Sequence, residues 1–122
     1  MITITKRFEF DYAHHLPRYP GKCANLHGHR GILEITISGG GGLLQRAKYT
    51  SMVMDFGLLK SIINDKIIDK VDHKNMNDLL EIPTAENFVR WVRNELKNIF
   101  EDDLIRIRFY ETPDCWAEWE KE

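Results

Sequence analysis

The sequence contains few cysteines and no long apolar run, and each of these scarcities excludes a class of protein. Two cysteines among 122 residues cannot build a disulfide scaffold. No apolar stretch approaches the roughly 20 residues that a membrane helix requires, and the opening residues do not resemble a signal peptide. We therefore expect a cytoplasmic protein that does not associate with membranes.

An excess of charge of one sign is also lacking. The chain has 17 Lys and Arg residues against 19 Asp and Glu residues, so its formal net charge is −2. This balance removes the strongest reason to propose nucleic acid as a partner, because phosphate backbones attract clustered positive charge. At 43% hydrophobic and 30% charged residues, the composition is that of a globular protein, and the length predicts one domain over residues 1–122.

Four segments alternate apolar and polar residues with the period of two that half-buried strands show. The first covers residues 2–10, and the second begins near residue 32 and ends at the glycines 39–42, which open a loop to about Ser51. The third follows the acidic residues 101–103, and the fourth follows Pro113-Asp114. Cys115 alternates with apolar residues of the fourth strand, so we expect it to be a structural core residue.

Two segments between the second and third strands have the spacing of amphipathic helices. Asp55 is the expected N-cap of the first, whose apolar face contains Leu59, Ile62, Ile63 and Ile67. Pro83 and Thr84 mark the start of the second, and Glu86 lies in its first turn, where a carboxylate suits the helix dipole. Its apolar face contains Ala85, Phe88, Val89, Val92, Leu96, Ile99 and Phe100.

The order of elements, β-β-α-α-β-β, predicts an α+β fold in which a four-stranded antiparallel sheet carries two helices on one face. The second face must then meet solvent or another subunit. Four strands also leave two open edges, which proteins usually protect by assembly or closure. We therefore expect the protein to form an oligomer.

Histidines gather near the ends of the first two strands. His27-Gly28-His29 lies just before the second strand, and residues i and i+2 of an extended segment project from the same face. His14 ends the first strand and can face the same ion, whereas the adjacent His15 should point the other way. Three imidazoles with an open fourth position are typical of a catalytic zinc site.

Three further positions have chemistry whose role the residues alone leave open. Cys23, four residues before His27, is a fourth zinc ligand, a small hydrophobic residue or a reactive thiol, whose thiolate a nearby cation favours. Asp72-His73 is either a common helix-end dipeptide or a carboxylate that orients an imidazole for proton transfer. Glu111 is either a solvated charge or an acceptor for paired N–H donors.

Taken together, these segments resemble the 6-pyruvoyltetrahydropterin synthase / 6-carboxytetrahydropterin synthase family. The segment Cys-x-x-x-His-Gly-His over residues 23–29 is the most specific of them. The other matching segments follow in family order over nearly the whole chain; they cover residues 10–17, 52–56, 71–73, 83–87 and 111–112. Two departures stand out: Ser51 replaces a usual glycine, and Arg30 and Gly31 follow the histidines where an aromatic residue often occurs.

The resemblance implies the tunnelling fold and a Zn²⁺ ion whose ligands are His14, His27 and His29. It also implies a catalytic triad of Cys23, Asp72 and His73. Glu111 would anchor the 2-amino and N3–H edge of a pterin, and the backbone at Thr84 and Ala85 would contact the same ring. Family members commonly form homohexamers of two stacked trimers with the active site between subunits, so the Asp–His pair can come from a neighbour.

The implied activity is that of a zinc-dependent lyase. It converts 7,8-dihydroneopterin triphosphate to 6-carboxy-5,6,7,8-tetrahydropterin, acetaldehyde and triphosphate in the biosynthesis of queuosine. One alternative is 6-pyruvoyltetrahydropterin synthase, which retains the side chain; the short chain and compact histidine motif favour the carboxy branch. The other is a non-catalytic module whose Cys and His residues close a structural zinc site. Lys22, Arg46 and Lys48 are the candidates for binding the triphosphate.

Overall fold

The computed structural model describes residues 1–39 and 51–122. The expected loop between Gly39 and Ser51 falls on residues 40–50, outside the described residues. The candidate phosphate ligands Arg46 and Lys48 lie in the same segment and are likewise outside them.

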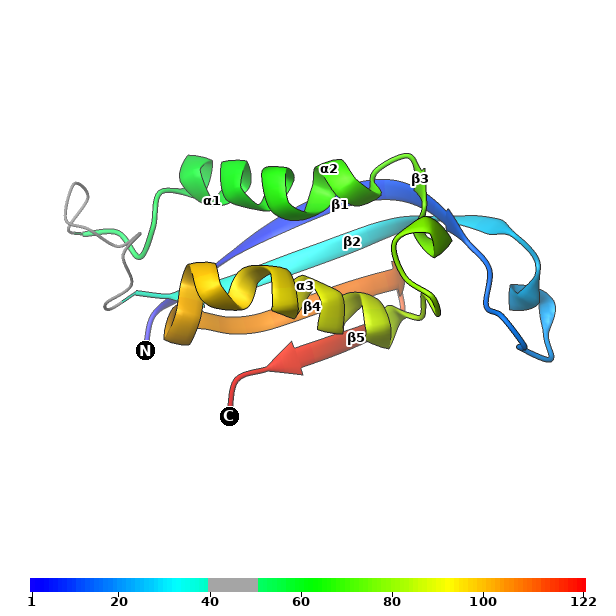
Figure 1. Ribbon diagram of the computed structural model, residues 1–122. Coiled ribbons are helices and arrows are strands. Elements are labelled where there is room, and N and C mark those ends of the chain that lie inside the picture. The colour runs from blue at the N-terminus through cyan, green and yellow to red at the C-terminus, as the bar shows by residue number, and fades with distance from the viewer. Residues whose placement is uncertain (40–50) are drawn as a thin grey trace.

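Five strands form one mixed sheet with the order β3-β1-β2-β4-β5 (Figure 1). Their bounds are β1 Thr3–His14, β2 His27–Ser38, β3 Lys74–Asn75, β4 Leu104–Thr112 and β5 Cys115–Glu120. The prediction of four antiparallel strands is corrected by β3, which pairs in parallel with β1 at Tyr12 and Ala13. Two residues are too few to show an alternating pattern, so this strand is defined only by its partner.

The first two strands are longer than their alternating apolar segments predict. β1 and β2 pair without interruption from Thr3 opposite Ser38 to His14 opposite His27. The motif His27-Gly28-His29 is therefore part of β2, and its two histidines project from one face of the sheet. The long pairing brings three histidines to one end of two neighbouring strands.

Two helical segments lie on the same face of the sheet, as predicted (Figure 1). The first comprises α1 Phe56–Ile63, a π-helical turn over Asn64–Ile68, and α2 Asp69–Val71; the second is α3 Ala85–Phe100. The Asp55 N-cap is confirmed, because its carboxylate accepts a hydrogen bond of 3.1 Å from the Gly57 N–H. Thr84 caps α3 in the same way, accepting from the Asn87 N–H at 3.1 Å.

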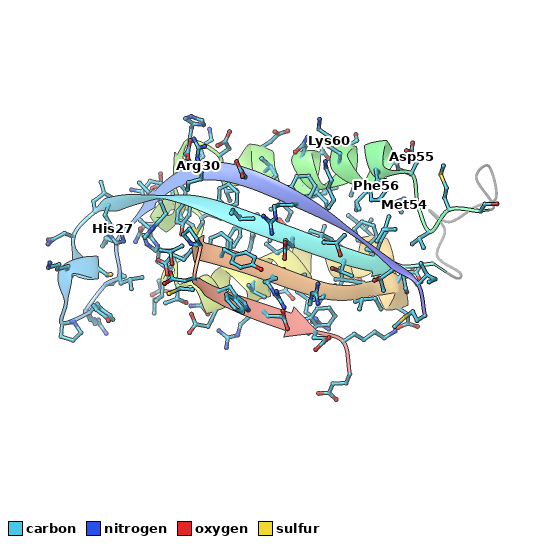
Figure 2. The ribbon with its side chains drawn as sticks, turned by 180° about the vertical axis from the view of Figure 1, so that it is seen from behind. His27, Arg30, Met54, Asp55, Phe56 and Lys60 are labelled. Atoms are coloured by element: carbon cyan, nitrogen blue, oxygen red, sulfur yellow. The ribbon has the colours of Figure 1, made fainter. Side chains whose placement is uncertain are left out.

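The hydrophobic core lies between this helical layer and the sheet. Its fully buried side chains come from both layers and include Leu33, Ile35, Ile37, Leu59, Ile63, Phe88, Leu96, Ile107 and Phe109. The view from behind shows strands without a covering helix (Figure 2). That second face carries cross-strand ion pairs, Arg7 with Glu34 at 2.7 Å and Arg108 with Glu118 at 2.6 Å.

The expectation that Cys115 is a core residue is wrong. Its side chain is exposed, because it starts the edge strand β5 and lines an open cavity between this strand and the beginning of α3. Among the described helices, none is long and apolar enough to cross a membrane.

Candidate metal centre and adjoining cavity

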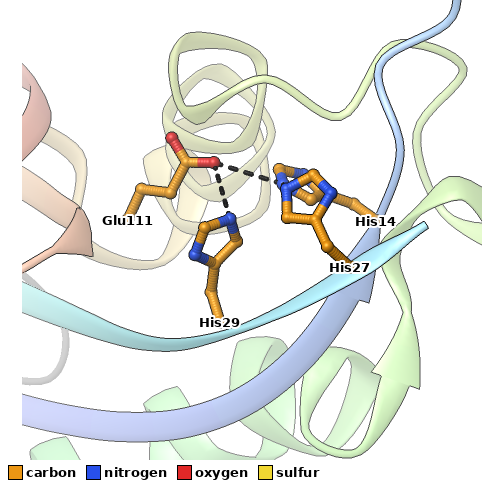
Figure 3. Close-up of side chains that lie close together, drawn as sticks. All are labelled: His14, His27, His29 and Glu111. Carbon is orange, nitrogen blue, oxygen red and sulfur yellow. Dashed lines mark hydrogen bonds and ion pairs between the residues drawn. The ribbon is translucent and has the colours of Figure 1, made fainter. Parts of the chain in front are cut away.

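Three histidines and one glutamate converge at the end of the sheet where β1 finishes and β2 begins (Figure 3). His14 comes from β1, His27 and His29 come from β2, and Glu111 comes from β4. One ligand atom from each residue lies within 4.8 Å of those of the other three. This group could hold a metal ion. His27 lies at the opposite end of the sheet from Asp55 and Phe56, which begin the first helical segment (Figure 2).

Backbone carbonyls orient two of the imidazoles. The Nδ1 atom of His14 lies 2.8 Å from the Pro83 carbonyl oxygen, and that of His27 lies 2.7 Å from the Asn25 carbonyl oxygen. A carbonyl only accepts, so each Nδ1 carries the proton and each Nε2 presents a lone pair. The two Nε2 atoms are 3.0 Å apart. Two lone pairs facing each other at this distance repel unless a cation lies beside both of them, so the tautomers fit a metal site.

His29 and Glu111 complete the group. The Nε2 atom of His29 is buried and has no hydrogen-bond partner in the described part of the chain. The Glu111 carboxylate lies 3.2 Å from the Nε2 atoms of both His14 and His29, within ion-pair distance. Burial lowers the pKa of His29 and thereby favours the neutral imidazole that binds metals. Three imidazole nitrogens and a carboxylate oxygen, with no thiolate, are a donor set that zinc accepts.

The Glu111 carboxyl remains ionised in this setting. Contact with His14 is the main influence that lowers its pKa, burial opposes this, and the nearby His29 acts in the same direction as His14. The carboxylate therefore supplies negative charge beside the imidazoles, which strengthens the case for a cation at this position.

Tyr12 adjoins this group and was not among the site residues predicted from the sequence. Its ring centroid lies 5.2 Å from that of His14 and 5.6 Å from that of His29. Its hydroxyl is buried, and no described residue forms a hydrogen bond with it. Burial together with the nearby Glu111 charge raises the pKa of this hydroxyl. One signal was available: Tyr12 precedes His14 by two residues on the same strand face.

The predicted Asp72–His73 pair forms at a different edge of the sheet. The Asp72 carboxylate lies 3.0 Å from Nδ1 of His73 and accepts a hydrogen bond of 3.1 Å from the Asp11 N–H. His73 adopts a left-handed backbone with φ of 58°, and its N–H donates to the Asp11 carbonyl at 2.6 Å. This conformation is strained for a residue other than glycine, and such strain is held only where surrounding contacts determine it.

Cys23 lies outside the four-residue group. It is half-buried in a short 3₁₀ turn over Lys22–Ala24. Within residues 1–39 and 51–122, no hydrogen bond or ion pair joins Cys23 to Asp72 or His73. His15 is also separate from the group, and its N–H donates to the Asn77 side-chain oxygen at 2.9 Å.

A cavity of about 550 Å³ adjoins the metal centre. It lies between the first turns of α3 and strand β5, where Ala85 and Glu86 face Cys115 and Trp116. Glu111 lines this cavity as well as touching the histidines, so one carboxylate links the two features. The site thus combines a place for a cation with a space for an organic ligand.

Comparisons with known proteins identify the family. The profile of the family described as 6-pyruvoyl tetrahydropterin synthase matches residues 3–122. A Haemophilus influenzae protein named 6-carboxy-5,6,7,8-tetrahydropterin synthase is 36% identical, and the match covers 99% of this chain and 100% of that protein. A Synechocystis protein of the same name is 35% identical over 92% of this chain and 88% of its own length.

A solved structure shares the fold. The 6-pyruvoyl tetrahydropterin synthase of Caenorhabditis elegans superposes with a TM-score of 0.80 at 24% identity, covering 99% of this chain and 96% of that one. The family profile and the curated relatives together extend over nearly the whole sequence. The chain therefore belongs to the 6-pyruvoyl tetrahydropterin synthase family.

Proposed function

We propose that this protein is a zinc-dependent 6-carboxy-5,6,7,8-tetrahydropterin synthase. It converts 7,8-dihydroneopterin triphosphate and one water molecule to 6-carboxy-5,6,7,8-tetrahydropterin, acetaldehyde and triphosphate, in the cytoplasmic biosynthesis of 7-deazaguanines such as queuosine. The names of the Haemophilus and Synechocystis relatives support this product. The observation that carries the proposal is the convergence of three histidine Nε2 atoms beside a cavity that shares Glu111 with them.

His14, His27 and His29 would hold the zinc ion. When bound, the ion supplies Lewis acidity, which makes hydroxyl groups of the substrate side chain easier to deprotonate. The carbonyls of Pro83 and Asn25 hold two of the rings by their Nδ1 atoms, so these ligands are oriented before any ion arrives.

Glu111 would recognise the pterin ring. A carboxylate accepts two parallel N–H donors, which matches the 2-amino and N3–H edge of a pterin. Glu111 lines the cavity together with Ala85, the first residue of α3, whose preceding cap is Thr84. A volume of about 550 Å³ is in the range of small-molecule pockets. In this proposal the ring occupies the cavity and its side chain reaches the histidines.

Cys23 and His73 would move protons between the substrate side chain and the ring, with Asp72 orienting the imidazole. Because no hydrogen bond or ion pair joins Cys23 to His73 among the described residues of one chain, a neighbouring copy would supply the Asp–His pair. The proposed assembly is a homohexamer of two stacked trimers. The sheet face without helices and the edge strands β3 and β5 support such an assembly (Figure 2). Light scattering on the eluting protein should give six times the monomer mass.

The product identifies the reaction. Zinc-loaded protein should be incubated with 7,8-dihydroneopterin triphosphate, and the products should be analysed by mass spectrometry. The mass of 6-carboxytetrahydropterin together with acetaldehyde would support the proposal. A product that keeps all three side-chain carbons as a pyruvoyl group would assign the sister activity. Unchanged substrate with zinc fully bound would refute both reactions.

Cys23→Ala is the matched variant for this assay. If the proposed function holds, this variant retains its zinc, because the thiol lies outside the group of four ligand atoms. It loses turnover, because the thiol that moves protons is gone. In the alternative of a closed Cys/His structural site, the same variant would lose zinc and unfold more readily.

A further inference from the structure

The Tyr12 hydroxyl is the unexplained polar atom beside the metal centre. The residue is 4% exposed, and its hydroxyl oxygen has no hydrogen-bond partner among residues 1–39 and 51–122. The ring is enclosed by aromatic neighbours, with centroids 5.5 Å from Phe10 and 5.9 Å from Phe109 as well as the two histidine contacts. Buried hydroxyls almost always have a partner, because an unpaired one has lost its water without compensation. A partner is therefore expected in some state of the protein.

Gly31 makes room for this ring. A Cβ atom at position 31 would lie 2.7 Å from the Phe109 ring and 3.1 Å from Cε1 of Tyr12, so both rings use the space that a side chain would fill. The pairing of Ile32 with Tyr110 also places Gly31 next to Glu111 across β2 and β4. The tyrosine ring thus lies beside the space left by Gly31, on the strand between β1 and β4.

Glu111 has two competing positions. In this structure its carboxylate contacts Nε2 of His14 and His29, the atoms that a metal ion would use. The same residue lines the cavity between α3 and β5, where it would accept ligand N–H donors. Once an ion occupies the imidazoles, a carboxylate that turns to the cavity needs a donor to hold it there. A phenol is protonated at neutral pH and has one O–H to donate.

We propose that Tyr12 is a positioning residue for Glu111: its hydroxyl donates a hydrogen bond to the Glu111 carboxylate when the carboxylate turns from the histidines to the cavity. This inference rests on the proposed pterin-binding function and deepens it. Both groups lie beside the same imidazole: the Tyr12 ring centroid is 5.2 Å from that of His14, and the Glu111 carboxylate is 3.2 Å from the His14 Nε2 atom. Tyr12 acts through Glu111 and needs no contact of its own with the ligand.

A double-mutant cycle tests this coupling. The dissociation constant of pterin-6-carboxylate would be measured by calorimetry on zinc-loaded wild type, Tyr12→Phe, Glu111→Gln and the double variant. Loss of a hydrogen bond to a charged group is expected to weaken binding by about tenfold in Tyr12→Phe. In the Glu111→Gln background the same change should have no further effect, because the carboxylate is already gone. Equal losses in both backgrounds, or no loss in either, would overturn the proposal.

Tyr110→Phe is the matched control. Its hydroxyl lies on the face without helices and is bonded to Arg108 at 3.1 Å, so this variant should bind the pterin as wild type does. In zinc-free protein, the melting temperature of Tyr12→Phe should be no lower than that of wild type, since the Tyr12 hydroxyl forms no hydrogen bond with any described residue. A lower midpoint for zinc-free Tyr12→Phe would assign the hydroxyl a structural role instead.

A second measurement separates this inference from the proposed function. In protein labelled with ¹³C at the ζ carbon of its four tyrosines, zinc alone should shift the Tyr12 resonance in wild type but not in Glu111→Gln. An unmoved resonance in wild type would refute the Tyr12–Glu111 contact even if pterin binds. A shift with zinc but no pterin binding by wild type would leave the contact standing and refute the proposed function.

Discussion

Zinc should raise the melting temperature of the wild-type protein, and His29→Ala should remove most of that increase while Cys23→Ala keeps it. Two imidazoles are already oriented through their Nδ1 hydrogen bonds, and the third, His29, has a buried Nε2 atom 3.2 Å from the Glu111 carboxylate. Binding of an ion by these groups therefore requires little rearrangement. Because Cys23 lies outside the group, its thiol contributes nothing to zinc affinity in this arrangement.

The size of the effect follows from linkage. At a free zinc concentration of 100 times the dissociation constant, binding stabilises the folded state by about 2.7 kcal/mol. For a domain of this length, 1 kcal/mol corresponds to roughly 4 °C, so the midpoint should rise by about 10 °C. His29→Ala also removes the 3.2 Å contact between its Nε2 atom and the Glu111 carboxylate, so the zinc-dependent rise of each variant is measured from its own zinc-free midpoint.

The assay is differential scanning fluorimetry of chelator-treated protein with and without Zn²⁺, with zinc content checked by mass spectrometry of the metal. Mg²⁺ is the control ion, because its preference for oxygen ligands does not match three imidazoles. The reasoning would be refuted if His29→Ala kept the full zinc-dependent increase. It would also be refuted if Cys23→Ala lost the increase, which would identify a closed structural site.

Three further predictions concern stability. Burial lowers the folded-state pKa of His29, so the unfolded chain binds more protons at mildly acidic pH. The unfolding free energy of zinc-free protein, measured by urea titration, should therefore fall as pH falls from about 7 to 5. In His29→Gln this free energy should depend less steeply on pH. Gly31→Val should destabilise the protein by about 1–3 kcal/mol in the same titrations, because its Cβ would meet the Phe109 ring, and an unchanged midpoint would contradict the packing described. Asp55→Ala should cost about 1 kcal/mol through loss of the Gly57 hydrogen bond, with Asp55→Asn retaining most of the stability.

The alternation of apolar residues was enough to predict the four long strands and the two helical segments. These patterns are local: they depend on a period of two or on steps of three and four residues. The Asp55 cap was predictable for the same reason, since its partner is two residues away. The two-residue strand β3 was missed because it has no period of its own and exists only through its hydrogen bonds to β1.

The exposure of Cys115 shows where a local pattern misleads. Alternation predicts which side chains share a face of a strand, but it does not reveal whether another element covers that face at a given residue. Cys115 begins an edge strand and borders a cavity, so its face is open there. Coverage depends on where α3 crosses the sheet, which is a property of the packed molecule.

Local patterns in the sequence were enough for the four long strands, the two helical segments, the shared face of His27 and His29, and the family resemblance, because each depends on residues close together in the chain. The tertiary structure decided that Glu111 joins the histidines, since only the pairing of β4 with β2 brings it to them. It also decided that Tyr12 presents an unpaired hydroxyl at the same site. Such contacts join residues about 80 to 100 positions apart in this chain, and no local pattern encodes the distance between them.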